Sequence, residues 1–265
     1  MTDRPFHRLL LAALALSVLV LVLFGSWPWL DLGFSGLFTD AAGGFPLAQV
    51  EGLQRLNLVI RRSLEGLAYV AVLATLLAMA ARLPLASGLR CWQFIAGAFV
   101  LGPGLIVNAL LKEHWGRARP ADVLEFGGAH HFTPVLLVTD QCRHNCSFSS
   151  GEVAMSATFV FVTLVLVWPR LGGIGRGVAL AAGAGFLILS AGLRITLGRH
   201  FLSDALVSTL ISALVVLGLY RLLGIGAARA AFGGAELRRD LALVRARLAA
   251  LAARLIRRTG GAPRA

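Results

Sequence analysis

The amino-acid sequence predicts an all-α polytopic membrane protein, built as a bundle of six transmembrane helices. Of its 265 residues, 57% are hydrophobic and only 14% are charged, and the mean hydropathy is +0.78. The apolar residues fall in long uncharged blocks and are not scattered as in a soluble core. A soluble domain of this size cannot bury that much apolar surface, so the blocks are interpreted as membrane spans.

Six blocks are long enough, or nearly long enough, to cross a bilayer. Arg4 and Arg8 precede the first block, but no small-residue cleavage site follows it, so we interpret it as a retained span and not as a signal peptide. Several blocks are short, and we expect their helices to extend into polar positions such as Glu65, Glu152 and Arg194. The predicted spans are 9–30, 64–81, 91–111, 153–168, 177–193 and 205–220.

Basic residues predict the orientation of the spans. With the N-terminus in the cytoplasm, 16 of the 25 basic residues fall on the cytoplasmic side and 9 on the outer side. This asymmetry is typical of arginines that flank membrane spans, and it also explains the net charge of +12 without a nucleic-acid partner. Both termini are therefore expected in the cytoplasm. The expected inner segments are 1–8, 82–90, 169–176 and 221–265, and the outer ones are 31–63, 112–150 and 194–203.

Two segments outside the predicted spans have helical patterns. In 31–63, Leu53, Leu56 and Ile60 share one face, which predicts an amphipathic helix along the outer interface. We expect residues 1–222 to form the membrane domain and 223–265 to form a cytoplasmic, arginine-rich helical tail. The tail is either a short coiled coil or, as its arginines favour, a helix on the anionic inner leaflet. Its heptad stripe is Leu237, Leu241, Val244, Leu248, Leu251 and Leu255.

Three polar clusters adjoin the predicted span ends. Segment 112–120 follows span three, 147–152 precedes span four, and 194–204 connects spans five and six. In an alternating topology all three lie on the outer face. Arginines and lysines at span ends often only extend to the interface, but three clusters on one face predict a site.

The first property of these clusters is a capacity to bind phosphate. Lys112, Arg119 and Arg194 supply cations, and a guanidinium donates two hydrogen bonds to phosphate oxygens. Ser150 and Gly151 stand where a helix is expected to begin, and the free backbone N–H groups there favour an anion.

The second property is a nucleophile with an orienting partner. His200 is followed four residues later by Asp204, about one helical turn away. The carboxylate could hold one ring nitrogen and leave the other free to attack. Cations and amides around a transferring phosphoryl group stabilise its transition state, so the clusters together favour phosphoryl transfer.

The spacing Lys-x6-Arg-Pro, then Ser-Gly, then Arg-x5-His-x3-Asp over residues 112–204 resembles the type-2 phosphatidic acid phosphatase superfamily. It looks most like the bacterial membrane branch, which includes lipid phosphatases and lipid A phosphatases. The resemblance implies that Lys112, Arg119, Ser150, Gly151 and Arg194 bind phosphate. It also implies that His200 forms a phosphohistidine while Asp204 orients it, with no metal or organic cofactor. The implied location is the bacterial cytoplasmic membrane, with the site facing the periplasm.

The middle motif departs from the family pattern. Glu152 stands where the family usually has the histidine that protonates the leaving group, and Leu193 replaces a serine that often precedes the arginine of the third motif. We favour Glu152 as the acid because it occupies the matching position. The alternatives are an acidic leaving group that needs little help, or another outer histidine: His114, His130, His131 or His144.

Cys142 and Cys146 lie in the extra outer segment 121–146, which we expect to shape the substrate entrance. In an oxidising compartment the pair could form a disulfide. A zinc site is the weaker interpretation, because His144 is the only nearby further ligand.

The function predicted from these features is hydrolysis of a lipid phosphate monoester or pyrophosphate at the outer face. The phosphorylated lipid is the expected partner. Two alternatives are a lipid phosphotransferase and a weakened member that only binds phospholipid headgroups, although a pure binder has no need of an oriented nucleophile. A transporter would place its charges nearer mid-membrane.

Overall fold

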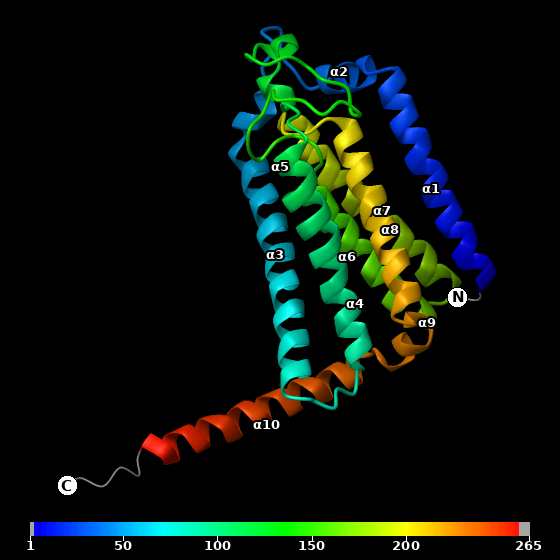
Figure 1. The fold of residues 1–265 in the computed structure, drawn as a ribbon, viewed down its shortest axis with the longest axis vertical. Coiled ribbons are helices and arrows are strands. Elements are labelled where there is room, and N and C mark those ends of the chain that lie inside the picture. Colours follow the sequence, from blue (N-terminus) through cyan, green and yellow to red (C-terminus); the bar gives the residue numbers. More distant parts are fainter. Residues whose placement is uncertain (1–2, 260–265) are drawn as a thin grey trace.

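The computed structural model describes residues 3–259, and over them the chain is helical without a strand. Within this range six helices are long and apolar enough to cross a membrane, which confirms the predicted fold class. They lie side by side as an elongated bundle (Figure 1). The spans are α1 (Asp3–Ser26), α3 (Glu51–Ala80), α4 (Leu89–Phe99) with its continuations η2 (Val100–Leu111) and α5 (Lys112–His114), α6 (Gly151–Val167), α7 (Gly173–Thr196) and α8 (Leu202–Leu222).

The first span ends earlier than predicted. α1 ends at Ser26, and a short helix, α2 (Trp29–Gly36), follows it across the end of the bundle (Figure 1). Pro28 explains the break, because a proline has no N–H to donate and disfavours helix at the residue before it. This break gives α2 its own direction and brings Asp31 into the bundle end, where it is fully buried.

The prediction of an interfacial amphipathic helix within 31–63 was wrong about its position. Its residues are helical, but they form the first turns of α3, which runs unbroken from Glu51 to Ala80. The inward stripe that begins at Leu53 and Ile60 continues in phase through Leu64 and Ala71, and no proline interrupts it. Because the stripe is continuous, the segment extends the second span beyond its predicted start.

The third span widens in its middle. α4 passes into η2, a stretch of π-helix that contains Pro103, and then into α5. Proline removes one hydrogen bond of the α-helical pattern, and π-helical turns are one way in which a helix accommodates such a change. The span therefore reaches Lys112 through a wider helix than the pattern of apolar residues predicts.

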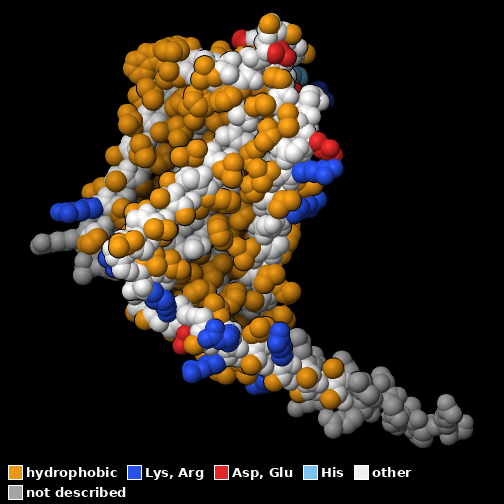
Figure 2. Space-filling view, turned by 180° about the vertical axis from the view of Figure 1, so that it is seen from behind, with side chains coloured by type: hydrophobic (Ala, Val, Ile, Leu, Met, Phe, Trp, Pro, Cys, Tyr) orange, Lys and Arg blue, Asp and Glu red, His pale blue; other side chains and the backbone are white. Residues whose placement is uncertain are grey.

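The helices pack around α6, which contacts α3, α4, α7, α8 and η2. α1 packs on α8 at one side of the bundle, and α3 packs on α4 at the other (Figure 1). Exposed apolar side chains cover the sides of the bundle (Figure 2). Such a surface would be unfavourable in water and is typical of a protein whose sides face lipid.

The tail is helical, as predicted. After α9 (Ile225–Ala228), α10 (Gly234–Thr259) leaves the bundle at the end opposite α2 and α5 (Figure 1). Asp240 ties it to the turn between α3 and α4, because its carboxylate accepts hydrogen bonds from the backbone N–H groups of Ala86, at 2.6 Å, and Ser87, at 3.1 Å. The side chains of Leu248, Leu251 and Leu255 lie outside the described residues.

Candidate active site

The three predicted clusters lie at one end of the bundle. The first follows η2 in α5, the second contains the N-terminus of α6, and the third is the turn between α7 and α8. This end is opposite the N-terminus of α1 and the start of α10 (Figure 1). The alternating directions of the spans, together with the short turn at 197–201, bring the clusters together.

A polar cavity of about 390 Å³ opens at this end. It is lined by four of the predicted residues, and two further arginines, Arg61 and Arg199, add to their positive charge. Glu152 is the only acidic side chain in the lining. The cavity therefore suits an anionic ligand. The predicted residues in it are Lys112, Arg119, Glu152 and Arg194.

A second cavity, of about 620 Å³, continues from the polar one toward the middle of the bundle. The two share Asn57, Arg61, Lys112 and Glu152 in their linings. Apart from these shared residues and the polar Glu65, Asn108 and Ser190, the lining of the second cavity is mainly apolar, and it lies largely between α3 and the third span. Its apolar lining includes Ile60, Leu64, Ala68, Val72, Phe99, Val100 and Leu105. A ligand with a charged head and an apolar body would fit the two cavities together.

Ser150 and Gly151 stand where the sequence predicts them, at the start of α6. Ser150 is the N-cap, and its hydroxyl, like that of Ser149, is buried with no hydrogen-bond partner among the described residues. A Cβ atom at position 151 would collide with Asn108 Oδ1, so any other residue here would require the Asn108 side chain to move. The resulting helix N-terminus can donate hydrogen bonds to an anion.

Glu152 is held between two arginines. Arg194 Nε lies 2.7 Å from one carboxylate oxygen, and Arg61 Nη1 lies 3.9 Å from the other. Arg194 is 7% exposed, so this pair lies largely out of water. A phosphate bound in the polar cavity would compete with Glu152 for Arg194.

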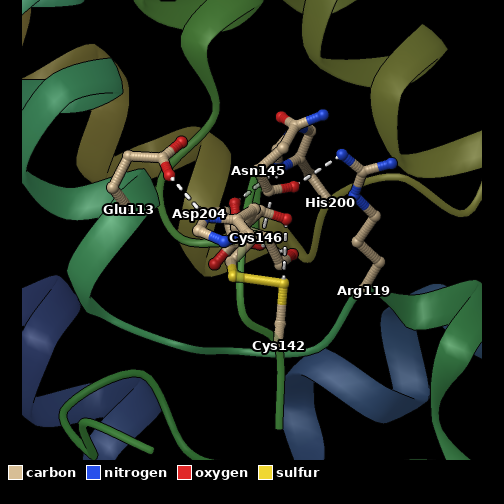
Figure 3. The surroundings of a disulfide bond; sticks show 9 residues. Glu113, Arg119, Cys142, Asn145, Cys146, His200 and Asp204 are labelled. Carbon is tan, nitrogen blue, oxygen red and sulfur yellow. Dashed lines mark hydrogen bonds and ion pairs between the residues drawn. A yellow bond between two sulfur atoms is a disulfide. The ribbon is translucent and has the colours of Figure 1, made fainter. Parts of the chain in front are cut away.

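A disulfide joins Cys142 to Cys146 beside Arg119 (Figure 3). Asn145, within this small loop, has a left-handed backbone, and its carbonyl oxygen accepts a hydrogen bond from Arg119 Nη2 at 2.7 Å. The loop therefore fixes the direction of the guanidinium. Of the segment 121–146, Asn145 is the residue that lines the polar cavity.

His200 is fully buried in the turn before α8, and its side chain, unlike those of Lys112, Arg119 and Arg194, lines neither cavity. Its Nδ1 lies 2.7 Å from the carbonyl oxygen of Ser147 and 3.7 Å from Asp204 Oδ2. The closest orienting partner is thus a main-chain carbonyl and not the predicted carboxylate. Since a carbonyl only accepts, Nδ1 carries the hydrogen, and Nε2, which has no partner among the described residues, has the free electron pair.

Burial lowers the pKa of His200 to about 4, and the charges of Arg194 and Lys112 act in the same direction. The nearby carboxylate of Asp204 opposes this shift. The ring is therefore neutral at physiological pH, which is the state that a nucleophile requires.

Asp204 is also fully buried, and its partners include residues that sequence reasoning missed. Its carboxylate accepts hydrogen bonds from Arg117 Nη1 at 2.6 Å, Ser147 Oγ at 2.5 Å and the N–H of Phe201 at 2.9 Å. Arg117 belongs to the first predicted cluster, but its position two residues before Arg119 gave no sign that its side chain points away from the cavity. Ser147 likewise belongs to the second cluster and had no assigned role.

The alternative histidines lie away from the cavities. His114, His130, His131 and His144 are all exposed, and none lines either cavity. His144 instead lies 3.3 Å from the Glu113 carboxylate. Glu152 is therefore the better placed candidate for the acid.

Comparison with known proteins agrees with the arrangement of these motifs. Residues 92–225 match the PAP2 superfamily. The chain belongs to this superfamily, as its motifs predicted. α1, α2 and α3 lie outside the matched residues, so Arg61 and Asp31 are additions to the site from beyond the matched region.

Two relatives of this PAP2 protein cover most of its length. A lipid A 4'-phosphatase of Rhizobium leguminosarum is 35% identical over 77% of this chain and 91% of its own length. A lipid A 4'-phosphatase of Rhizobium etli is also 35% identical, over 77% of this chain and 82% of its own. A third, from Francisella tularensis subsp. novicida, is 38% identical over 42% of this chain and 48% of its own. No solved structure matches the chain.

Proposed function

We propose that this chain is a membrane phosphatase that hydrolyses a lipid phosphate monoester or pyrophosphate at the periplasmic face of the bacterial cytoplasmic membrane. The observation that carries the proposal is that His200 is buried and neutral, with its Nδ1 hydrogen donated to the Ser147 carbonyl. The charges of Arg194 and Lys112 act on the same ring. Membership of the PAP2 superfamily and the names of the relatives support the same activity.

The first step is attack of His200 Nε2 on phosphorus. A P–N bond forms as the bond to the leaving oxygen breaks, and that oxygen takes a proton from Glu152. Lys112, Arg119, Arg194 and the start of α6 stabilise the charge on the equatorial oxygens. For this role Glu152 must carry a proton when substrate is bound, and transfer of Arg194 from Glu152 to the phosphate would favour that state.

The second step is hydrolysis of the phosphohistidine. The Glu152 carboxylate, left deprotonated by the first step, accepts a proton from water as its oxygen attacks phosphorus. The P–N bond breaks, inorganic phosphate leaves, and His200 returns to its neutral form with the hydrogen on Nδ1. Glu152 is protonated again, so the cycle closes.

The apolar cavity supports a lipid substrate. It begins at the polar cavity and runs along α3, so an acyl chain could lie in it while the phosphate reaches the cations. Because the relatives are named lipid A 4'-phosphatases, a lipid A phosphate ester is the first substrate to test.

The periplasmic orientation is supported by the excess of arginine at the other end and by the disulfide, which is stable in an oxidising compartment. We expect a cysteine introduced at Glu113, which is exposed, to react in intact cells with a thiol reagent that does not cross the cytoplasmic membrane. Reaction only after the membrane is opened would reverse the proposed topology.

The decisive experiment is phosphate release from a panel of lipid phosphates by the purified protein. His200→Ala should abolish turnover, and the matched control His144→Ala should not, because His144 is exposed and lines neither cavity. Turnover by His200→Ala would contradict the mechanism. Transfer of phosphate to an acceptor lipid in place of release would identify a phosphotransferase, and binding without turnover would identify a headgroup-binding protein.

A further inference from the structure

Arg117 is fully buried, and all three nitrogens of its guanidinium donate hydrogen bonds. Nε donates to the carbonyl of Thr133 at 2.9 Å, Nη2 to Asp31 Oδ2 at 2.8 Å, and Nη1 to Ser203 Oγ at 2.9 Å and Asp204 Oδ1 at 2.6 Å. The aromatic rings of Phe132 and Phe201 lie 5.4 Å and 4.3 Å from its Cζ atom. Every nitrogen of the guanidinium is hydrogen-bonded within the protein, so Arg117 is not placed to contact substrate.

Asp31 anchors this guanidinium from a different part of the chain. It lies on α2, and it is fully buried. Its other oxygen accepts a hydrogen bond from the Ser203 N–H at 2.9 Å, and the Ser203 hydroxyl donates to Oδ2 at 2.5 Å. Asp31 therefore binds both Arg117 and the first turn of α8, one residue before Asp204.

The same network reaches His200 through Ser147. The backbone N–H of Ser147 donates to the Arg117 carbonyl at 2.8 Å, and its hydroxyl donates to Asp204 Oδ2. Its own carbonyl then accepts the hydrogen of His200 Nδ1. Ser147 is thus held at two points by the residues that Asp31 and Arg117 fix, and it presents the atom that orients the nucleophile.

We propose that Arg117, anchored by Asp31, is a positioning residue for catalysis, because it fixes Asp204 and Ser147 and through them the direction of His200 Nε2. The inference rests on the proposed function of His200. The planar guanidinium is needed, because one group serves four acceptors in different directions and lies against an aromatic ring, whereas the lysine ammonium is a compact point charge. Ion pairs this deeply buried are a poor source of net stability, so a role in geometry accounts for them better than stability alone.

The test compares Arg117→Lys, Arg117→Met and Asp31→Asn with Arg119→Lys, and uses Arg90→Met, at an exposed position in the first turn of α4 that lines neither cavity, as the matched control. For each full-length variant, kcat, KM and the inhibition constant of orthovanadate are measured. Vanadate resembles phosphate, so its inhibition constant reports directly on the phosphate-binding residues. A nucleophile misplaced by about 1 Å loses roughly 100-fold in rate. We therefore expect kcat to fall by that order in both Arg117 variants and less in Asp31→Asn, with KM and vanadate inhibition unchanged. Arg119→Lys should instead raise KM and weaken inhibition by vanadate.

Three outcomes would overturn the inference. The first is an unchanged kcat in Arg117→Met. The second is a change in KM and in vanadate inhibition of the Arg117 variants that matches the change in Arg119→Lys. The third is a purely structural effect, in which the fraction of folded protein falls while the kcat of that fraction is normal. If Arg117→Met does not fold, Arg117→Lys and Asp31→Asn decide, since both keep the size and polarity of the site. An inactive wild type or an active His200→Ala would contradict the proposed function, a result distinguishable from all three.

Discussion

His200 Nδ1 lies 2.7 Å from the carbonyl oxygen of Ser147, a full ångström closer than its 3.7 Å distance to the carboxylate of Asp204. A neutral carbonyl can fix the tautomer of the ring without holding a proton of its own, whereas the carboxylate behind it would stabilise the positive charge that develops in the proposed attack by Nε2. The orienting task that the sequence assigned to Asp204 is therefore met at closer range by another residue. Orientation belongs mainly to Ser147, and charge compensation belongs to Asp204.

The first prediction concerns pH. Because the pKa of His200 is lowered to about 4, the nucleophile stays neutral and active until the pH falls to that value, and below it protonation removes the attacking electron pair. An ordinary histidine, with a pKa of about 6.5, would already be mostly protonated at pH 5. We expect the acid limb of kcat/KM, corrected for the separately measured ionisation of the substrate, to have its midpoint near 4. A midpoint near 6.5 would show that His200 is not the titrating nucleophile.

The sequence predicted the six spans and the gathering of the three polar clusters at one end of the bundle, because uncharged blocks and span-end clusters are local patterns. It did not predict the role of Arg117 or Asp31, because their pairing joins α2 to α8 across 86 residues from Asp31 to Arg117 and 87 from Arg117 to Asp204. Burial of a charge depends on such distant partners and not on the composition around it. The helical stripe of α3 was visible in the sequence, but its continuation into the bundle was missed where Arg61 and Arg62 interrupt the apolar residues.

The second prediction tests Glu152 as the acid. If Glu152 protonates the leaving oxygen, Glu152→Gln should lose roughly 10²- to 10⁴-fold in turnover of a lipid phosphate, whose alkoxide leaves poorly. The same variant should lose much less with p-nitrophenyl phosphate, whose phenolate leaves without a proton. The measurement is the ratio of kcat/KM for the two substrates in wild type and variant. An equal loss with both would assign Glu152 to binding, through its pair with Arg194.

The third prediction concerns the disulfide. Replacement of Cys142 and Cys146 by serine should free Asn145 and the guanidinium that its carbonyl holds, so KM should rise while kcat changes less. A reductant should have the same effect on wild type and none on the double variant. Cys91→Ser is the control, because Cys91 is a free, buried cysteine in the third span. An unchanged KM would mean that Arg119 keeps its direction without the loop.

The last prediction separates the lipid chain from the phosphate. Ala68 lines the apolar cavity on α3, so Ala68→Phe should fill part of that space, whereas Leu73→Phe on the same helix changes an exposed side chain that lines neither cavity. We expect Ala68→Phe to lower kcat/KM for long-chain lipid phosphates and to leave p-nitrophenyl phosphate turnover unchanged, because the polar cavity is not altered. Leu73→Phe should leave both unchanged. If Ala68→Phe lowers kcat/KM equally for both substrates, the added ring disturbs the bundle and not the chain-binding space. If it lowers kcat/KM for neither, the acyl chain lies elsewhere, most simply against the lipid-facing side of the helices.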